Sequence, residues 1–284
     1  MRKILACVDG SIYTETVAAC AAWASERTGA SIKLLYAVSS SPHRENTPDL
    51  SGAIGLGAKG ELLEHLAELD ESHGRLEQRK GKLILEHAEQ LVRDSGVRHI
   101  ERLHRRGSLL EAIGELENQM DLIVMGKRGE HADVDSLHPG PNLERVARAI
   151  HKPLLVSARI FQPIRRVLFA FDGGPSAHKA LDYIARQPLL KGLECHVLRV
   201  GRVSDQAHAS LIGTAHTLEQ AGLSVHTAVR MGNAEEVMAA YVESKDIDLV
   251  VMGAYGHSRI RSLIIGSTTT AMIRSCNVPI LLFR

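Results

Sequence analysis

The chain of 284 residues contains one sequence pattern twice, and this internal repeat is the feature that most constrains its fold. The segment RVLFAFDG, residues 166–173, matches the character of KILACVDG, residues 3–10. The segment DLVVMG, residues 248–253, likewise matches DLIVMG, residues 121–126. Because the repeated unit is much longer than the 20–50 residues typical of a solenoid, we predict two tandem domains of one kind.

Each copy alternates short apolar runs with helical stretches. Residues 3–8 and 31–38 predict strands, and residues 14–28 predict a helix that stops at Gly29. A strand–helix–strand order favours a parallel sheet with crossover helices. We therefore predict the α/β class, with two tandem five-stranded parallel-sheet sandwiches of Rossmann-like type.

The same reasoning places the other elements and the domain boundaries. We expect a first domain at residues 1–158 and a second at residues 164–284, joined by a linker around residues 158–163. Further strands are expected at residues 97–103, 121–125 and 153–158, and further helices at 61–95, 108–117, 142–150 and about 204–221.

The first copy carries an insertion at residues 39–81 that the second copy largely lacks. Residues 39–60 are rich in polar residues and glycine, and predict a loop. Their GLGAKG, residues 55–60, is no dinucleotide fingerprint because no strand precedes it. In the helix that follows, Gly74 and Gly81 are candidate break points. We expect its leucine stripe to face the core, with leucines at 62, 66, 69, 83, 85 and 91.

Charge and hydropathy give no support to two classes of partner. The formal net charge is +1, so electrostatics offers no argument for nucleic acid. No apolar run approaches the roughly 18 residues that a transmembrane helix needs, so we expect no membrane insertion. The first residues, MRKILACVDGS, do not resemble a signal peptide because their apolar run is short.

The cysteines and histidines point to a reducing compartment and to no metal site. The four cysteines are far apart and form no C-x-x-C pair, so we expect free thiols in the cytoplasm. The 15 histidines form neither an H-E-x-x-H motif nor an H-x-H cluster, and we predict no metal-binding residues.

The segment DLVVMGAYGHSRIRSLIIGSTTT, residues 248–270, carries the clearest chemical signal. An apolar run ends at Gly253, and further glycines follow at Gly256 and Gly266. Glycines let the backbone approach a ligand closely. Ser267 and Thr268 then open a helix, and the free N–H groups of a helix N-terminus favour phosphate. For any single glycine, a plain structural turn is the alternative.

The spacing G-x2-G-x9-G-[ST] resembles the nucleotide-binding signature of the universal stress protein family. That resemblance implies two domains with an adenine nucleotide alpha hydrolase-like sheet. It also implies ATP in the second domain, with Mg²⁺ held through the phosphates rather than by the protein. Carried over to this chain, the binding positions are Asp172, Val200, Met252, Gly253, Gly256, Gly266, Ser267 and Thr268, with His257 and Arg259 as further cationic candidates.

The family resemblance also predicts how the two copies associate. The last strand often pairs with its counterpart across a two-fold axis in this family, which here means residues 154–157 against residues 280–283. One chain would then form an intramolecular pseudo-dimer, and a further homodimer is an open alternative. An apolar terminal edge strand fits this expectation, because left unpaired it would promote aggregation.

The first copy departs from the signature. Gly126 and Gly129 are present, but ten residues separate Gly129 from Gly140, and Pro141 follows. Proline has neither a backbone N–H nor a hydroxyl, so two phosphate donors are lost. Two such bonds contribute about 3–6 kcal/mol, so their loss raises Kd at least about a hundredfold. Lys127 and Arg128 could attract an anion but do not restore the geometry, and we expect poor ATP binding here.

Three functions remain open at this point. The first is a cytoplasmic ATP-binding protein of stress response or signalling, with no catalytic residues and at most slow, incidental ATP hydrolysis. The second is an adenylyl-transfer enzyme, because DGGPSA, residues 172–177, keeps two glycines of a pyrophosphate loop. The third is a nucleotide-independent scaffold or a small-ligand-binding regulatory protein, with an unknown protein partner at the insertion.

Overall fold

The computed structural model describes residues 2–38, 56–129, 140–202, 204–254 and 266–284, and for residues 56–64 and 70 it describes the backbone alone. The elements of the first half, in chain order, are β1 Lys3–Cys7, α1 Thr14–Thr28, β2 Ser31–Val38, α2 Leu56–Asp94, β3 Ile100–Arg106, α3 Leu109–Leu116, β4 Leu122–Gly126, α4 Pro141–Ala149 and β5 Leu154–Ser157. Those of the second half are β6 Arg166–Ala170, α5 Pro175–Arg186, β7 Glu194–Val200, α6 Asp205–Gln220, β8 Ser224–Arg230, α7 Ala234–Ser244, β9 Leu249–Gly253, α8 Ser267–Ser275 and β10 Ile280–Phe283.

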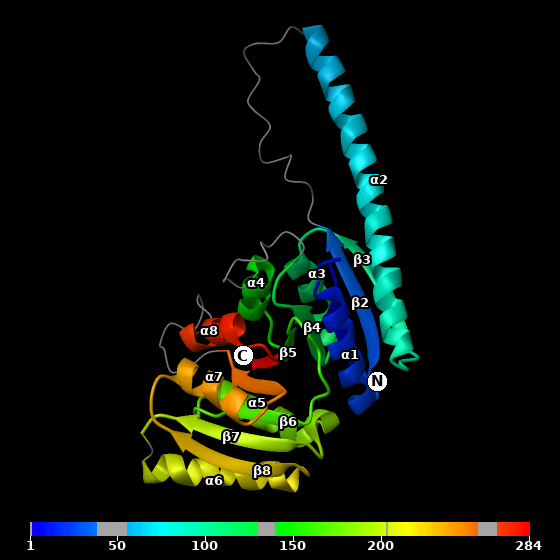
Figure 1. The fold of residues 1–284 in the computed structure, drawn as a ribbon. Coiled ribbons are helices and arrows are strands. Elements are labelled where there is room, and N and C mark those ends of the chain that lie inside the picture. The colour runs from blue at the N-terminus through cyan, green and yellow to red at the C-terminus, as the bar shows by residue number, and fades with distance from the viewer. Residues whose placement is uncertain (1, 39–55, 130–139, 203, 255–265) are drawn as a thin grey trace.

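The strands form one ten-stranded sheet in the order β3-β2-β1-β4-β5-β10-β9-β6-β7-β8. Each half is parallel, and the halves meet where β5 and β10 pair antiparallel, with Leu155 opposite Leu281. Figure 1 shows the two halves side by side with these strands between them. The predicted fold of two five-stranded parallel units joined as a pseudo-dimer is confirmed. Residues 158–165 connect β5 to β6, and the domain boundaries stay a prediction.

Both faces of the sheet are buried, as parallel sheets require. Alternate residues of β1 point to opposite faces, so Ile4 belongs to one apolar cluster and Leu5 to the other. Helices α1, α2, α5 and α6 supply buried side chains to the first cluster. Helices α3, α4, α7 and α8 supply the second. This three-layer arrangement leaves the carboxyl ends of the strands accessible to ligands.

Several local predictions are confirmed in detail. Helix α1 has the predicted bounds and ends at Gly29, which adopts the left-handed φ of 68° that glycine tolerates. Helix α3 lies within the predicted range 108–117, and the structure shows that Ser108 caps it through a capping box with Glu111. Strand β3, by contrast, begins at Ile100 rather than at residue 97, because its pairing with β2 sets its start opposite Ile32.

The insertion differs most from the prediction. Helix α2 is a single helix of 39 residues from Leu56, so the loop expected up to Gly60 is wrong for residues 56–60. Residues 39–55 lie outside the described part of the chain. The predicted break points are wrong, because α2 continues through both Gly74 and Gly81. Glycine at position 81 is explained by a close contact, since an added Cβ would lie 2.6 Å from the Tyr36 ring. Although α2 is long, no described helix is long and apolar enough to cross a membrane.

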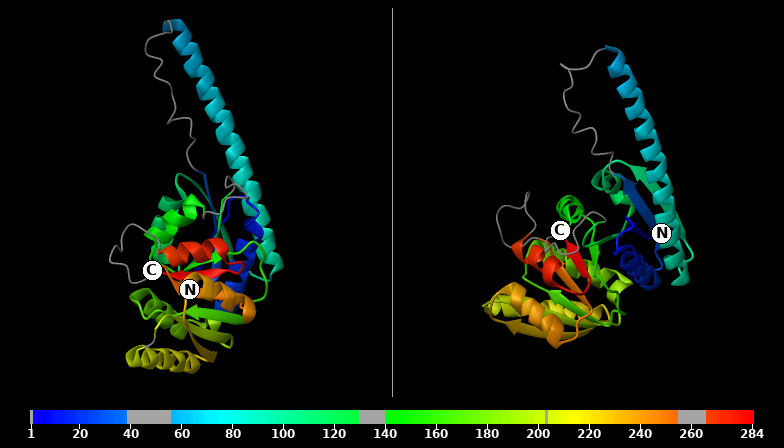
Figure 2. Two further views of the ribbon diagram at one scale, coloured as in Figure 1. Left: turned by 60° about the vertical axis from the view of Figure 1, so that its left-hand side comes forward. Right: turned by 45° about the horizontal axis from the view of Figure 1, so that its top comes forward.

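The leucine stripe of α2 is core-facing only in its last turns. Figures 1 and 2 show α2 projecting away from the sheet, so that its N-terminal part has no neighbouring layer. Leu85 is 4% exposed and packs in the core, whereas Leu69 is 64% exposed. The core-face prediction is therefore wrong for Leu66, Leu69 and Leu83, which are all exposed, and the backbone alone is described at residue 62.

A matched pair of substitutions on α2 tests this division. Leu85→Ala should lower the free energy of unfolding by about 2–5 kcal/mol, because it leaves a cavity in the packed core. Leu69→Ala should change it by no more than about 0.5 kcal/mol, because the side chain is already in solvent. Chemical denaturation of both variants measures the difference, and equal losses would contradict the assignment.

Candidate functional site

The carboxyl ends of β6, β7 and β9 lie together in the second half, since Ala170 pairs with both Leu198 and Met252. Asp172 follows β6 and is half-buried. Its Oδ1 accepts a hydrogen bond from the N–H of Gly174 at 2.8 Å, where α5 begins. Capping the turn before α5 is therefore the structural explanation for an aspartate at position 172. This hydrogen bond uses only one of the two carboxylate oxygens.

Two other expected binding positions have evident packing roles. The side chain of Met252 is 5% exposed and belongs to the core beneath α7 and α8, so any ligand contact must come from its backbone. Gly253 ends β9, and an added Cβ there would lie 2.8 Å from Cβ of Ser176. The close approach of α5 therefore accounts for glycine at this position. Val200 is half-buried at the end of β7.

The start of α8 is held firmly against the end of β9. Gly266 caps the helix with φ −53° and ψ 142°, and its N–H donates to the carbonyl of Ala254 at 3.1 Å. The buried hydroxyl of Thr269 donates to the carbonyls of Gly253 and Ala254, each at 3.2 Å. Sequence reasoning noted a run of threonines but gave Thr269 no role.

Seven of the ten predicted positions are described, and they lie on these neighbouring strand ends and at the start of α8. Ser267 is exposed and Thr268 is half-buried in the first turn of α8, where backbone N–H groups lack intrahelical partners. Gly256, His257 and Arg259 lie outside the described residues.

The first half repeats this backbone with different chemistry. Gly140 caps α4 with φ −61° and ψ 142°, almost the same angles as Gly266, and its N–H donates to the carbonyl of Lys127 at 2.9 Å. Pro141 occupies the first position of α4. The Asp9 carboxylate lies beside Gly129, where an added Cβ would come within 2.9 Å of Oδ2. Asp9 follows β1 as Asp172 follows β6, so this acidic position is common to both halves.

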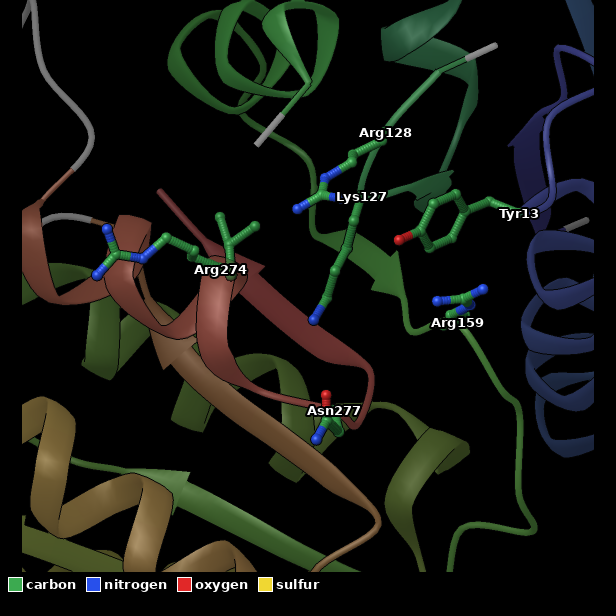
Figure 3. A pocket seen from close by; sticks show the side chains of 7 residues that line it. Tyr13, Lys127, Arg128, Arg159, Arg274 and Asn277 are labelled. Carbon is green, nitrogen blue, oxygen red and sulfur yellow. The ribbon is translucent and has the colours of Figure 1, made fainter. Parts of the chain in front are cut away.

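A cavity of about 160 Å³ lies between the two halves, beside this loop. Figure 3 shows the cationic side chains around it. Arg274 comes from α8 of the second half, and its Nη2 also forms an ion pair with Oε1 of Glu235 at 3.8 Å. The described residues of the lining include no carboxylate, and are Tyr13, Lys127, Arg128, Arg159, Ile273, Arg274 and Asn277.

Lys127 links the halves at this cavity. Its Nζ donates a hydrogen bond to the carbonyl of Cys276, the C-cap residue of α8. A cation is favourable at a helix C-terminus. Burial lowers the pKa of Lys127, and the Arg128 charge adds to that effect, while Cys276 opposes it. Sequence reasoning missed this cavity because its cations come from segments far apart in the chain.

Comparisons with known proteins agree with this architecture. The universal stress protein family matches residues 1–158 and 203–284. The universal stress protein Slr1230 of Synechocystis sp. is 40% identical over 287 aligned residues and all of both chains. The chain therefore belongs to the universal stress protein family.

Solved structures show the same fold at lower identity. A universal stress protein of Archaeoglobus fulgidus is similar with a TM-score of 0.72 and 21% identity, over 99% of this chain and 98% of that one. A putative universal stress protein of Pseudomonas aeruginosa gives a TM-score of 0.62 and 14% identity, over 100% and 93%. The tandem arrangement of this chain thus spans nearly the full length of these relatives.

Proposed function

We propose that this universal stress protein binds one adenine nucleotide, ATP with Mg²⁺, in its second half. The observation that carries the proposal is the start of α8, where Gly266 and Ser267 complete the family's glycine spacing beside the end of β9. The helix dipole places roughly half a positive charge there, which favours phosphate. We place its action in stress response or signalling rather than in catalysis.

Each part of the nucleotide has a proposed binding region. Asp172 and Val200 contact the adenosine end beyond β6 and β7, while the backbone of Met252 and Gly253 lines the ribose side. The first-turn N–H groups of α8, with the hydroxyls of Ser267 and Thr268, hold the phosphates. Mg²⁺ is held through the phosphates. Gly256, His257 and Arg259 complete the phosphate loop in this proposal.

The first half, in contrast, is proposed to bind ATP poorly. Pro141 supplies no N–H or hydroxyl at the position of Ser267. Asp9 follows β1 as Asp172 follows β6, and the capping glycines of the two halves have nearly the same backbone conformation. The difference at Pro141 therefore acts on the phosphates.

The cysteines support the proposed cytoplasmic location. All four are buried and free of disulfides. Burial raises the pKa of Cys7 and of Cys195 to about 12, and for Cys7 the nearby Asp9 charge contributes to this rise. These thiols therefore stay protonated and unreactive. Unpaired buried thiols are typical of a reducing compartment.

A reciprocal exchange at the two helix starts tests the nucleotide site. Ser267→Pro copies the first half and should raise the Kd for Mg-ATP at least about a hundredfold, because two donors to charged phosphates are lost. Proline is well tolerated at this first helical position, so the fold should survive. Pro141→Ser is the control and should keep the wild-type affinity of the second half. Calorimetric titration measures both, and wild-type affinity in Ser267→Pro would contradict the proposal.

The cationic cavity favours a second candidate function, a regulatory protein that binds a small anion between its halves. Four of the seven described residues that line it are cationic, and Lys127 is 9% exposed. Bound there, an anion would contact both halves at once and so stabilise their docked arrangement.

Inorganic phosphate is the probe for this second candidate. Arg159→Gln should weaken phosphate binding about tenfold or more, because a charge-assisted contact is lost. Arg186→Gln, an exposed arginine at the end of α5 away from the cavity, should leave it unchanged. Calorimetry on the full chain measures both. Equal weakening by both variants, or no phosphate binding, would contradict this function.

A further inference from the structure

We propose that Glu194, His196 and His226 form a binding site for one divalent transition-metal ion of the zinc type. The site lies toward the amino ends of β7 and the edge strand β8, whereas the candidate nucleotide site lies at the carboxyl ends of the strands. Glu194 and His196 are two residues apart on β7 and so share a face. His226 lies on the edge strand β8 and pairs directly with His196. The fold thus places three ligand side chains from two strands together.

The ligand atoms lie at separations that suit a metal ion. Oε1 of Glu194 is 2.9 Å from Nε2 of His196 and 3.4 Å from Nε2 of His226. One ligand atom from each of the three residues lies within 4.8 Å of the others. In a tetrahedral zinc site with bonds of about 2.0–2.1 Å, neighbouring ligand atoms are about 3.3 Å apart. The two separations from Glu194, 2.9 and 3.4 Å, are thus close to the spacing that one shared ion requires.

Tyr241 of α7 fixes the orientation of the central histidine. Its hydroxyl lies 2.9 Å from Nδ1 of His196, whose side chain is nearly buried. When Nδ1 carries the proton and donates a hydrogen bond to the Tyr241 hydroxyl oxygen, the lone pair of Nε2 is available to the metal ion. Metal-binding histidines commonly have such a partner on their second nitrogen. Tyr241 is therefore a positioning residue for the proposed site.

The first half shows how the same positions are satisfied without a metal. There Lys33 pairs with Glu101 in the register that His196 and His226 occupy in the second half. The two form an ion pair at 2.9 Å, so a lysine supplies the positive charge. In the second half no lysine stands at these positions. A bound cation would take its place against the Glu194 carboxylate.

The chemistry of the ligands selects the class of ion. Two imidazoles and one carboxylate suit zinc and its neighbours in the first transition series rather than calcium or magnesium. His226 is 56% exposed on its side-chain surface, so the remaining coordination position is open to water. The ion would bind the edge strand β8 to β7 in the folded state alone, and so stabilise the fold.

The site is separate from the candidate nucleotide site. Val200 ends β7 four residues after His196 and six after Glu194, which places it about 13–20 Å along the strand from these two ligands. Loss of the metal should therefore leave nucleotide binding in place. This separation also lets the two proposals fail independently.

Titration of the chelator-treated full chain with zinc, and with cobalt as a spectroscopic substitute, tests the metal site. We expect one ion per chain, a higher melting temperature with zinc, and a visible cobalt spectrum. His226→Gln and Glu194→Gln should each weaken binding by at least the roughly tenfold that even an outer-shell partner contributes. Both side chains are solvent-accessible, so these variants should fold.

His216→Gln provides the matched control, since His216 is an exposed histidine on α6 outside the cluster. It should bind the ion as the wild type does. Tyr241→Phe should weaken binding without changing the stoichiometry. The proposal is overturned if the wild type takes up no zinc, or if His226→Gln binds zinc as tightly as His216→Gln.

Discussion

The antiparallel pairing of β5 with β10 is the contact on which the rest of the architecture depends. Leu155 and Leu281 face each other at its centre, and both are fully buried. Without it, each half would expose an apolar edge strand to aggregation. With it, two parallel sheets become one, and the segment after β4 meets the end of α8 between the halves. The cationic cavity exists only because this pairing brings Lys127 to the end of α8.

Duplication has preserved the backbone of the two halves while their side chains diverged. Gly140 and Gly266 cap their helices with nearly the same angles, yet proline follows one and serine the other. The register that holds Lys33 and Glu101 in the first half holds two histidines in the second. If the two proposals above hold, the second half has specialised for a nucleotide and a metal ion, and the first for contacts to its partner half.

The sequence predicted the repeated elements well because their signals are local. Gly29 ends α1 and Ser108 caps α3, each through contacts within a few residues. Features that depend on distant neighbours could not be predicted in this way. Gly81 looked like a helix breaker, but it accommodates Tyr36. The histidine cluster and the cationic cavity were missed because their members are separated by many residues, or lie on different strands, and meet only in the folded sheet.

Identification of the small molecules that the purified full chain carries tests the central claim most directly. The protein would be denatured and the released compounds analysed by mass spectrometry. The account predicts about one adenine nucleotide per chain, bound in the second half. A protein that releases no adenine nucleotide, and whose melting temperature does not shift with millimolar Mg-ATP, would contradict it and leave the glycine segment a structural turn.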